Sequence, residues 1–301
     1  MKRMLFIYNP RAGRQKGRAM LPELVEHFAR QDYELTVYPT QKAGDAAARA
    51  ACASGYDRVV CCGGDGTMNE VVTGLLTLPR EERPPVGYVP AGSANDYARS
   101  LELPKTLAEQ AVIAAVGTPK ALDMGDSAGR TFTYISAFGL FTEVSYATPQ
   151  NAKNLLGHFA YLLEGAKGLL NVPSFFMEVT APGGIRVEGE FIYGMVGNTV
   201  SMGGTFSLPR ELVKLDDGQF EVILIRKPKT VKDWQSMLSM LNMKSLTMEG
   251  SVVGFHADEV TFRSSDEVAW TVDGEFGGKR RETTVRNLCR AVDVACLPPE
   301  G

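Results

Sequence analysis

The pattern of apolar runs changes near Ala121, and this change constrains the fold more than any other feature. Before it, short apolar runs that predict buried strands alternate with amphipathic segments that predict helices. We expect strands at 4–8, 33–38, 58–62 and 86–89, and helices at 17–30, 43–54, 69–78 and 107–116. Such alternation predicts a parallel sheet covered by helices on both faces.

After Ala121, strand-like runs separated by Gly and Pro dominate, at 132–138, 175–180, 186–197, 219–226, 252–263, 268–273 and 283–296. Helices are expected to interrupt them at 158–170 and 231–243. This pattern predicts an antiparallel β-sandwich or barrel, of which we favour the sandwich. A chain of 301 residues suits two domains. We therefore predict a doubly wound α/β domain over 1–125 and a β-sandwich domain over 126–301.

Composition and charge exclude several classes of protein. The net charge of −3 argues against a nucleic-acid partner held by bulk electrostatics. The five cysteines are odd in number and form no C-x-x-C pair, which predicts a reducing compartment and hence a cytoplasmic protein. The first apolar run is too short for a signal peptide, and no run is long enough to span a membrane. A lipid substrate would thus be met at the membrane surface.

The run Gly63-Gly64-Asp65-Gly66-Thr67 stands between a buried strand and a helix expected to begin near Asn69. Glycine lets the backbone turn sharply and lets a ligand approach the main chain. The helix start offers free N–H groups and partial positive charge, which suit a phosphate. A tight turn capped by Thr67 or Asn69 is the alternative.

Two familiar phosphate loops do not match this run. A Walker A loop needs G-x-x-x-x-G-K-[ST], which is not present in the chain. A dinucleotide fingerprint needs a final glycine where Asn69 stands. Asp65 would repel a bare phosphate, so its position is reasonable when Mg²⁺ lies between the two groups.

Three motifs together resemble those of the diacylglycerol kinase catalytic domain. They are the residues 63–67, Asn9-Pro10-Arg11-Ala12-Gly13, and the segment 90–99, which reads PAGSANDYAR. The first motif is shared with sphingosine and ceramide kinases and echoed in NAD kinases. The resemblance covers essentially the whole chain and is greatest to the bacterial soluble lipid kinases. It implies an ATP- and Mg²⁺-dependent enzyme.

The resemblance also implies which residues bind the nucleotide. Ser93 stands where many relatives have Thr, and Arg11 stands where many have a small or polar residue. The implied nucleotide contacts are Asn9, Pro10, Arg11, Ala12, Gly13, Thr40, Gly64, Asp65, Gly66, Thr67, Met68, Asn69, Glu70 and Ser93.

Four acidic residues match the family's catalytic positions. Asp65, Asp96 and Asp123 resemble its Asp–water–Mg²⁺ network. Glu275, in the sequence Asp273-Gly274-Glu275, matches its proposed general base. The alternatives are a helix N-cap for Asp96, a turn residue for Asp123 and a plain Asp-Gly hairpin turn before Glu275.

A second, structural Mg²⁺ site is implied away from the chemistry. Its ligands would be the Asp217 carboxylate and the carbonyl groups of Lys214 and Gln219, and the alternative is an Asp-Gly turn. Gly203-Gly204 resembles the family's glycine-rich approach to this site. Lys167 matches a basic residue near the family's cleft, or is a solvated surface lysine.

The expected function is transfer of phosphate from ATP to a lipid hydroxyl, with diacylglycerol the favoured acceptor and phosphatidic acid the product. Alternatives are another acceptor (phosphatidylglycerol, a sphingoid base or NAD) or a nucleotide-binding regulator without turnover. We expect a cytoplasmic protein that binds the membrane transiently. The sequence leaves open whether it forms a homodimer. Six cations before the first acid suit anionic lipid, ATP or a solvated face: Lys2, Arg3, Arg11, Arg14, Lys16 and Arg18.

Overall fold

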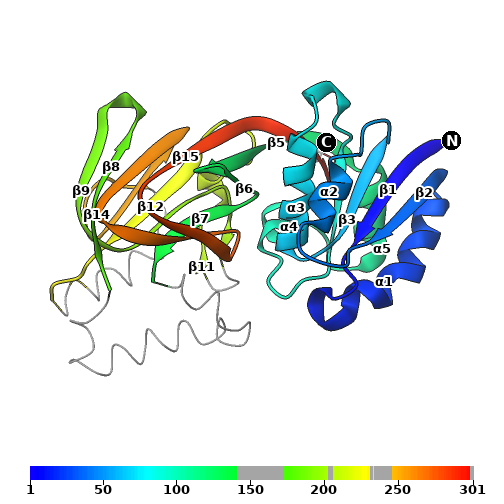
Figure 1. Cartoon of the computed structure of the whole chain (residues 1–301), viewed down its shortest axis with the longest axis horizontal. Coiled ribbons are helices and arrows are strands. Elements are labelled where there is room, and N and C mark those ends of the chain that lie inside the picture. Colours follow the sequence, from blue (N-terminus) through cyan, green and yellow to red (C-terminus); the bar gives the residue numbers. More distant parts are fainter. Residues whose placement is uncertain (141–172, 203–205, 231–232, 234–245, 299–301) are drawn as a thin grey trace. The chain divides into compact units, whose positions relative to one another are not determined.

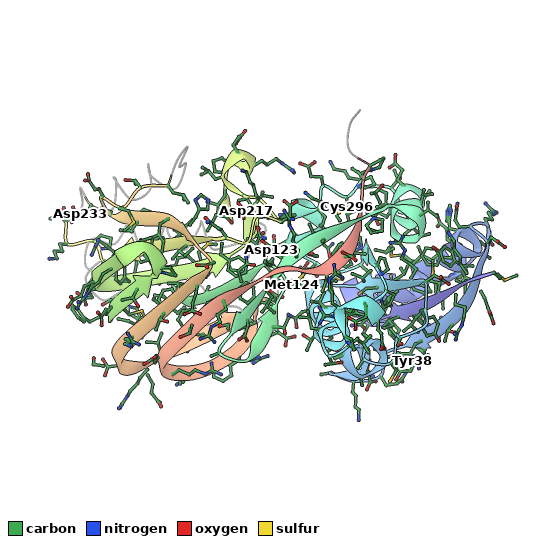
Figure 2. All side chains as sticks on the ribbon, turned by 90° about the horizontal axis from the view of Figure 1, so that it is seen from above. Tyr38, Asp123, Met124, Asp217, Asp233 and Cys296 are labelled. Carbon is green, nitrogen blue, oxygen red and sulfur yellow. The ribbon has the colours of Figure 1, made fainter. Side chains whose placement is uncertain are left out.

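The computed structural model describes residues 1–140, 173–202, 206–230, 233 and 246–298. The chain divides into unit 1, formed by Met1–Met124 with Cys289–Gly301, and unit 2, formed by Gly125–Leu288. It leaves unit 1 within strand β5 (Thr118–Ser127), where Figure 2 labels Asp123 and Met124, and returns within β15 (Glu275–Cys296). The segment after Leu288 therefore belongs to unit 1 and not, as predicted, to the second domain.

Unit 1 contains a parallel sheet whose strands lie in the order β2-β1-β3-β4-β15. The end of β15 joins it because Val294 pairs with Val86 of β4. The other strands are β1 (Lys2–Tyr8), β2 (Tyr33–Pro39), β3 (Arg58–Gly63) and β4 (Val86–Pro90). The helices are α1 (Ala12–Ala29), α2 (Asp45–Ala50), α3 (Asp65–Leu76), α4 (Asp96–Ser100) and α5 (Leu107–Val116), with a 3₁₀ turn at Arg80–Glu82.

Helices cover both faces of this sheet (Figure 1). On one face, α1 and α5 pack against alternate residues of β1 and β3 in a core that includes Phe6, Phe28 and Val60. The intervening residues, such as Leu5 and Val59, are equally buried and point to the other face, because side chains alternate along a strand. There α2 and α3 pack against each other.

Three helix starts differ from prediction because tertiary contacts override local preference. α1 begins at Ala12 although it contains Gly13 and Gly17. A Cβ at Gly13 would lie 2.0 Å from the Ala91 carbonyl oxygen, and one at Gly17 would lie 2.2 Å from that of Asn9. These glycines thus serve close packing. α3 begins at Asp65, inside the predicted loop, and the short helix α4 was not predicted.

Most described strands of unit 2 form an antiparallel sheet in the order β13-β12-β9-β7-β14-β15, and β8 pairs with both β9 and β14, whereas β10 and β11 pair with each other in a separate two-stranded sheet. The sequence pattern did not predict β5, and it merged β13 with the start of β14. The bounds are β6 (Arg130–Phe132), β7 (Ile135–Gly139), β8 (Phe175–Ala181), β9 (Ile185–Gly197), β10 (Ser201–Met202), β11 (Phe206–Ser207), β12 (Phe220–Arg226), β13 (Val252–Ala257) and β14 (Glu259–Val272). 3₁₀ turns lie at Pro182–Gly184 and Arg210–Leu212.

One aromatic-rich core fills this unit. The Phe138 ring lies 5.0 Å from that of Trp270 and 5.8 Å from that of Phe262, measured between centroids. The same core includes Phe255 of β13, at one end of the strand order, and Val285 of β15, at the other. The sheet must therefore curl, so that one hydrogen-bonded path encloses the core.

Some predicted features lie outside the described residues. These are the helix expected at 158–170, Lys167 within it, and Gly203-Gly204. The helix expected at 231–243 also lies outside them, apart from the single residue Asp233. Among the helices that the structure does describe, none is long and apolar enough to cross a membrane.

Candidate active site

The strand order of unit 1 locates a ligand-binding edge. From β1 the chain moves to β2 on one side, and β3 then lies on the other side of β1. The loops that follow β1 and β3 consequently diverge at a topological switch point, the place where open α/β sheets bind ligands. These loops carry the first two motifs of the sequence.

Asn9 joins these two loops. Its side-chain amide donates to the Thr67 hydroxyl at 3.2 Å, and its backbone N–H donates to the Cys62 carbonyl at 2.8 Å. The side-chain oxygen of Asn9 accepts from the Arg11 N–H at 2.9 Å, which fixes the start of the first loop. Asn9 is therefore committed to organising the loops, in addition to any contact with a ligand.

Glycines hold the motif at residues 63–67 in contact with the motif at residues 90–99. The backbone N–H of Ala91 donates to the Gly63 carbonyl at 2.7 Å. A Cβ at Gly92 would lie 2.7 Å from the Gly64 Cα, a distance that real Cβ atoms do not adopt. Gly13 has a φ of +54°, in the left-handed region. The three loops can pack this closely only without side chains at these positions.

The amino end of α3 lies at this edge of the sheet. Gly64 is the N-cap and Asp65, Gly66 and Thr67 form the first turn. Their backbone N–H groups precede the first intrahelical bond, which runs from the Met68 N–H to the Gly64 carbonyl. The Thr67 and Met68 side chains are buried. For Met68, predicted as a nucleotide contact, only the main chain is thus suited to a ligand.

Glu70 has a structural partner that the sequence did not indicate. Its carboxylate accepts from the Gly44 N–H at 2.9 Å and the Ala46 N–H at 3.1 Å, at the amino end of α2. The Asp45 carboxylate folds back onto the Gln41 N–H at 2.7 Å. Both contacts order the loop that follows Thr40, whose own N–H donates to the Tyr8 carbonyl at 3.0 Å.

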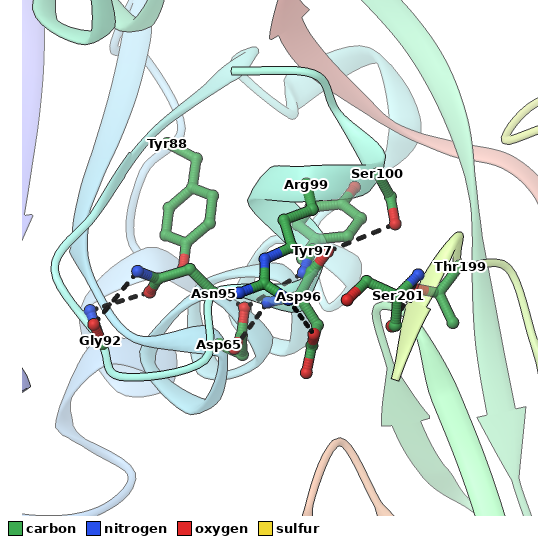
Figure 3. A network of polar contacts seen from close by, with 10 residues as sticks. All are labelled: Asp65, Tyr88, Gly92, Asn95, Asp96, Tyr97, Arg99, Ser100, Thr199 and Ser201. Atoms are coloured by element: carbon green, nitrogen blue, oxygen red, sulfur yellow. Dashed lines mark hydrogen bonds and ion pairs between the residues drawn. The ribbon is translucent and has the colours of Figure 1, made fainter. Parts of the chain in front are cut away.

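Asp65 and Asp96 are brought together at the start of α4 (Figure 3). The Asp65 carboxylate accepts from the Asp96 N–H at 3.2 Å and from the Tyr97 N–H at 3.3 Å. The Tyr88 hydroxyl lies 3.3 Å from the Gly63 carbonyl and 3.5 Å from the same carboxylate. Asp65 therefore satisfies the helix start from another loop, a role that sequence analysis had considered for Asp96.

The turn before α4 is specified by Asn95. Its φ of +54° is one that Asn tolerates better than most residues, and it exchanges side-chain hydrogen bonds with Gly92 at 2.9 and 3.1 Å. Asp96 is then almost fully buried, and its carboxylate lies 3.7 Å from the exposed Arg99 guanidinium. Two carboxylates at one helix start concentrate negative charge that suits a divalent cation.

Asp123 lies within β5 and so is not the turn residue that was considered as an alternative. It is buried, and its carboxylate accepts from the Arg290 N–H at 2.7 Å. Arg290, with a φ of +49°, belongs to the part of β15 that returns to unit 1. Asp65, Asp96 and Asp123 all belong to unit 1, whereas Glu275 belongs to unit 2.

Glu275 is exposed just after the Asp273-Gly274 turn, which Asp273 anchors. One Asp273 carboxylate oxygen accepts from the N–H and hydroxyl of Thr133 at 2.7 and 2.8 Å, and the other accepts from the N–H groups of Tyr134 and Ile135, both at 3.1 Å. Burial raises the pKa of the Asp273 carboxyl, while these bonds oppose that shift. The sequence suggested only a turn dipeptide here.

The loop predicted to hold a structural Mg²⁺ precedes β12, and Figure 2 labels Asp217 on it. The Asp217 carboxylate accepts from the Gln219 N–H at 3.0 Å, and Gly218 has a φ of +79°. The Asp-Gly turn is therefore present. The described residues hold no cluster of three or more His, Cys, Asp or Glu side chains suited to a metal. The site predicted here, one carboxylate with two backbone carbonyl groups, would not be a cluster of that kind.

A buried acid lies two residues beyond this loop. The Glu221 carboxyl is almost fully buried, and burial raises its pKa to about 9. One of its oxygens lies 3.5 Å from the His256 imidazole, whose nitrogen is 3.1 Å from the Leu212 carbonyl. Glu221 was not predicted, because its burial depends on the pairing of β12 with β9 and β13.

The cations near the amino end of the sequence do not form one patch. Lys2 and Arg3 begin β1, whereas Arg11 follows its end. A strand of this length spans roughly 20 Å. Arg3 is also engaged, since its N–H donates to the Asp57 carboxylate at 2.7 Å. Among the cations whose side chains the structure describes, Arg11, Lys16 and Arg18 lie at or within the first two turns of α1, which follows the carboxyl end of β1.

Comparisons with known proteins agree with the motifs. A family model described as the diacylglycerol kinase catalytic domain matches residues 3–127. The diacylglycerol kinase of Staphylococcus aureus strain bovine RF122 is 32% identical over 97% of this chain and 92% of its own length. That of Staphylococcus carnosus strain TM300 is 32% identical over 92% and 90%.

Solved structures share the fold along the whole chain. A crystal structure from Bacillus anthracis strain Sterne, of a protein proposed to be a diacylglycerol kinase, has a TM-score of 0.81 at 24% identity and covers 99% of this chain and 98% of its own. The predicted resemblance is thus confirmed over nearly the full length of the sequence. The chain belongs to the diacylglycerol kinase family.

Proposed function

We propose that this protein transfers the γ-phosphoryl group of ATP to the hydroxyl of a lipid, with diacylglycerol the favoured acceptor. The observation that carries the proposal is the set of three glycine-lined loops packed at the switch point of unit 1, beside the amino end of α3. Family membership supports the same reaction. We further propose that the protein works from the cytoplasm and meets its lipid at the membrane surface.

The residues of unit 1 fit a triphosphate. The N–H groups of the first turn of α3 and the positive end of its dipole favour phosphate oxygens. Positions 13, 64 and 92 have no room for a Cβ or lie in close backbone contact, which lets the three loops pack together at the start of α3. Asn9, Arg11, Thr40 and Ser93 would complete the nucleotide site, as the family's motifs imply.

The acids of unit 1 fit a magnesium ion. Asp65 and Asp96 are linked through the Asp65 carboxylate and the Asp96 N–H, so their charges lie close together at the phosphate-binding edge. Because the described residues hold no cluster of three acidic side chains placed to bind one metal directly, these two acids and Asp123 would hold Mg²⁺ largely through water. Bound there, the ion would offset the repulsion between Asp65 and the phosphates and neutralise charge during transfer.

Glu275 would accept the proton of the attacking hydroxyl. Its exposure on a turn, and the buried anchoring of that turn by Asp273, support this role. A structural Mg²⁺ bound by the Asp217 carboxylate and the carbonyls of Lys214 and Gln219 would order the loop before β12. The Asp-Gly turn found there supports the donor geometry only in outline.

A direct test incubates the purified protein with labelled ATP, Mg²⁺ and a panel of acceptors in mixed micelles. The panel includes diacylglycerol, phosphatidylglycerol, a sphingoid base and NAD. We expect label in phosphatidic acid, and its loss in the Glu275→Gln variant. Label in another product would reassign the acceptor. If no acceptor is labelled although the protein binds ATP, the chain is a nucleotide-binding regulator and the proposed reaction is wrong.

A further inference from the structure

An aromatic side chain stands exposed immediately after the proposed base. Phe276 is 48% exposed, although it lies in a strand of a well-packed sheet. A single exposed apolar side chain is common on protein surfaces, so its neighbours decide whether it has a role. Two contacts hold its main chain: the Arg130 guanidinium donates to the Phe276 carbonyl, and the Arg280 guanidinium donates to the Gly277 carbonyl at 2.7 Å.

Strand register places a cation on the same face as Phe276. Phe276 pairs with Thr271, and Lys279 pairs with Ala269 two residues along β14. Thr271 and Ala269 share a face because side chains alternate with a period of two. Gly277 is the extra residue of a β-bulge at this point, which restores the alternation for Lys279. Phe276 and the exposed Lys279 are therefore neighbours on one side of the sheet.

The turn carries more positive than negative charge. Between Glu275 and Arg281 there are three cations, Lys279, Arg280 and Arg281, and Arg130 contacts the same turn. Glu275 is the acid within this stretch. The next acid along β15 is Glu282, whose carboxylate lies 3.2 Å from the Arg263 guanidinium. On β14, Asp266 and Glu267 immediately precede Val268, the partner of Arg280, so they lie beside the cationic end of this stretch and offset part of its charge.

A second exposed phenylalanine in unit 2 has different surroundings. Phe176 of β8 is 55% exposed, and its cross-strand partner is Glu190, whose carboxylate lies 2.9 Å from the Lys227 ammonium group. Glu178 and Glu188 form the pair two residues further on, and the Arg186 guanidinium lies near both. Exposure alone thus does not distinguish the two aromatic residues, but the cations near Phe176 are paired with acids, whereas the cross-strand partner of Lys279 is Ala269.

We propose that Phe276, with Arg130 and Lys279, contacts the surface of an anionic phospholipid bilayer. Aromatic rings favour the headgroup region of membranes, and cations near that surface are attracted by anionic lipid. Docking through this turn would hold Glu275 at the depth where a lipid hydroxyl lies. The proposal rests on the proposed lipid-kinase function and names the membrane contact of its acceptor site.

Vesicle co-sedimentation without nucleotide tests the contact. Phosphatidylcholine vesicles with and without phosphatidylglycerol are compared for the wild type, Phe276→Ser and Lys279→Glu. We expect Phe276→Ser to weaken binding to anionic vesicles by roughly threefold to tenfold, given a half-exposed ring. Lys279→Glu should weaken anionic binding by roughly tenfold or more and leave neutral vesicles unaffected. Phe276→Trp should retain binding.

Matched controls separate the proposal from general effects. Phe176→Ser removes an equally exposed ring and Lys105→Glu makes the same charge change on an exposed residue of unit 1, so both should bind as the wild type does. The proposal is overturned if Phe276→Ser binds like Phe176→Ser, or if the wild type ignores anionic vesicles. Failure of the kinase reaction would be seen separately, as unlabelled lipid in detergent micelles.

Discussion

Replacing Asp273 by Asn should unlock the turn that presents Glu275. The substitution keeps the size of the side chain but turns one accepting oxygen into a donating NH₂ group. The best arrangement points this group at the Thr133 side, where the hydroxyl can rotate to accept. The Thr133 N–H, now 2.7 Å from its acceptor, is then left buried without a partner.

The expected loss of stability follows from the hydrogen bonds that the substitution removes or weakens. One buried N–H without an acceptor costs about 1–3 kcal/mol, and the remaining bonds to Tyr134 and Ile135 lose the strength that a charged acceptor gives. Removal of a buried charge partly offsets this loss. We expect a net decrease of about 2–4 kcal/mol in the free energy of unfolding. For a unit of this size the melting temperature should fall by roughly 5–15 °C.

Thermal unfolding followed by circular dichroism measures the effect, with Asp126→Asn as the control. The Asp126 carboxylate accepts one hydrogen bond, from the Gly129 N–H at 2.8 Å in a half-buried turn, so its variant should melt near the wild type. Below the melting range, Asp273→Asn should lower the rate of phosphoryl transfer and leave ATP affinity unchanged. If Asp273→Asn melts like Asp126→Asn, the anchoring argument is wrong.

Three further outcomes are expected. Glu275→Gln should lower kcat by roughly 10²–10⁴-fold while calorimetry finds unchanged ATP affinity, whereas equal loss of both would give Glu275 a structural role. Gly92→Ala should lower stability by about 1–3 kcal/mol and weaken ATP binding, because its Cβ would meet the Gly64 Cα; a stable variant with normal affinity would contradict this. Burial raises the pKa of Glu221 to about 9. Between about pH 5 and pH 9 the folded protein therefore keeps a proton on Glu221 that the unfolded chain has released. Wild-type stability should thus fall as pH rises towards 9, and in metal-free buffer Glu221→Gln should gain stability over the wild type at pH 8 relative to pH 5; an unchanged difference would refute the reasoning.

Local patterns predicted the strands of unit 1 and the glycine-rich loops well. A short apolar run followed by glycine leaves few choices, because strand, turn and helix start are adjacent in sequence. The start of α3 was still misplaced, since Asp65 and Gly66 are weak helix formers and are held in the helix by contacts of its first turn. Sequence therefore located the nucleotide loops but not the boundary within them.

The anchoring of the proposed catalytic acids could not be predicted in the same way. Asp273 meets Thr133 across most of unit 2, and Asp65 meets the start of α4 from a different loop. Nothing in the neighbouring residues signals such partners. The burial of Glu221 likewise depends on which strands flank β12, and the pairing of Val294 with β4 depends on the path of the whole chain. These are long-range contacts, which periodicity does not encode.

The route of the chain through β5 and β15 has a consequence for biosynthesis. Unit 2 is an insertion within unit 1, so the sheet of unit 1 lacks its β15 edge until the ribosome has translated past Val294. Until then the nascent polypeptide exposes the open side of β4, a template for wrong pairing. Completion of the nucleotide-binding half is thereby tied to prior synthesis of the half that carries the proposed base.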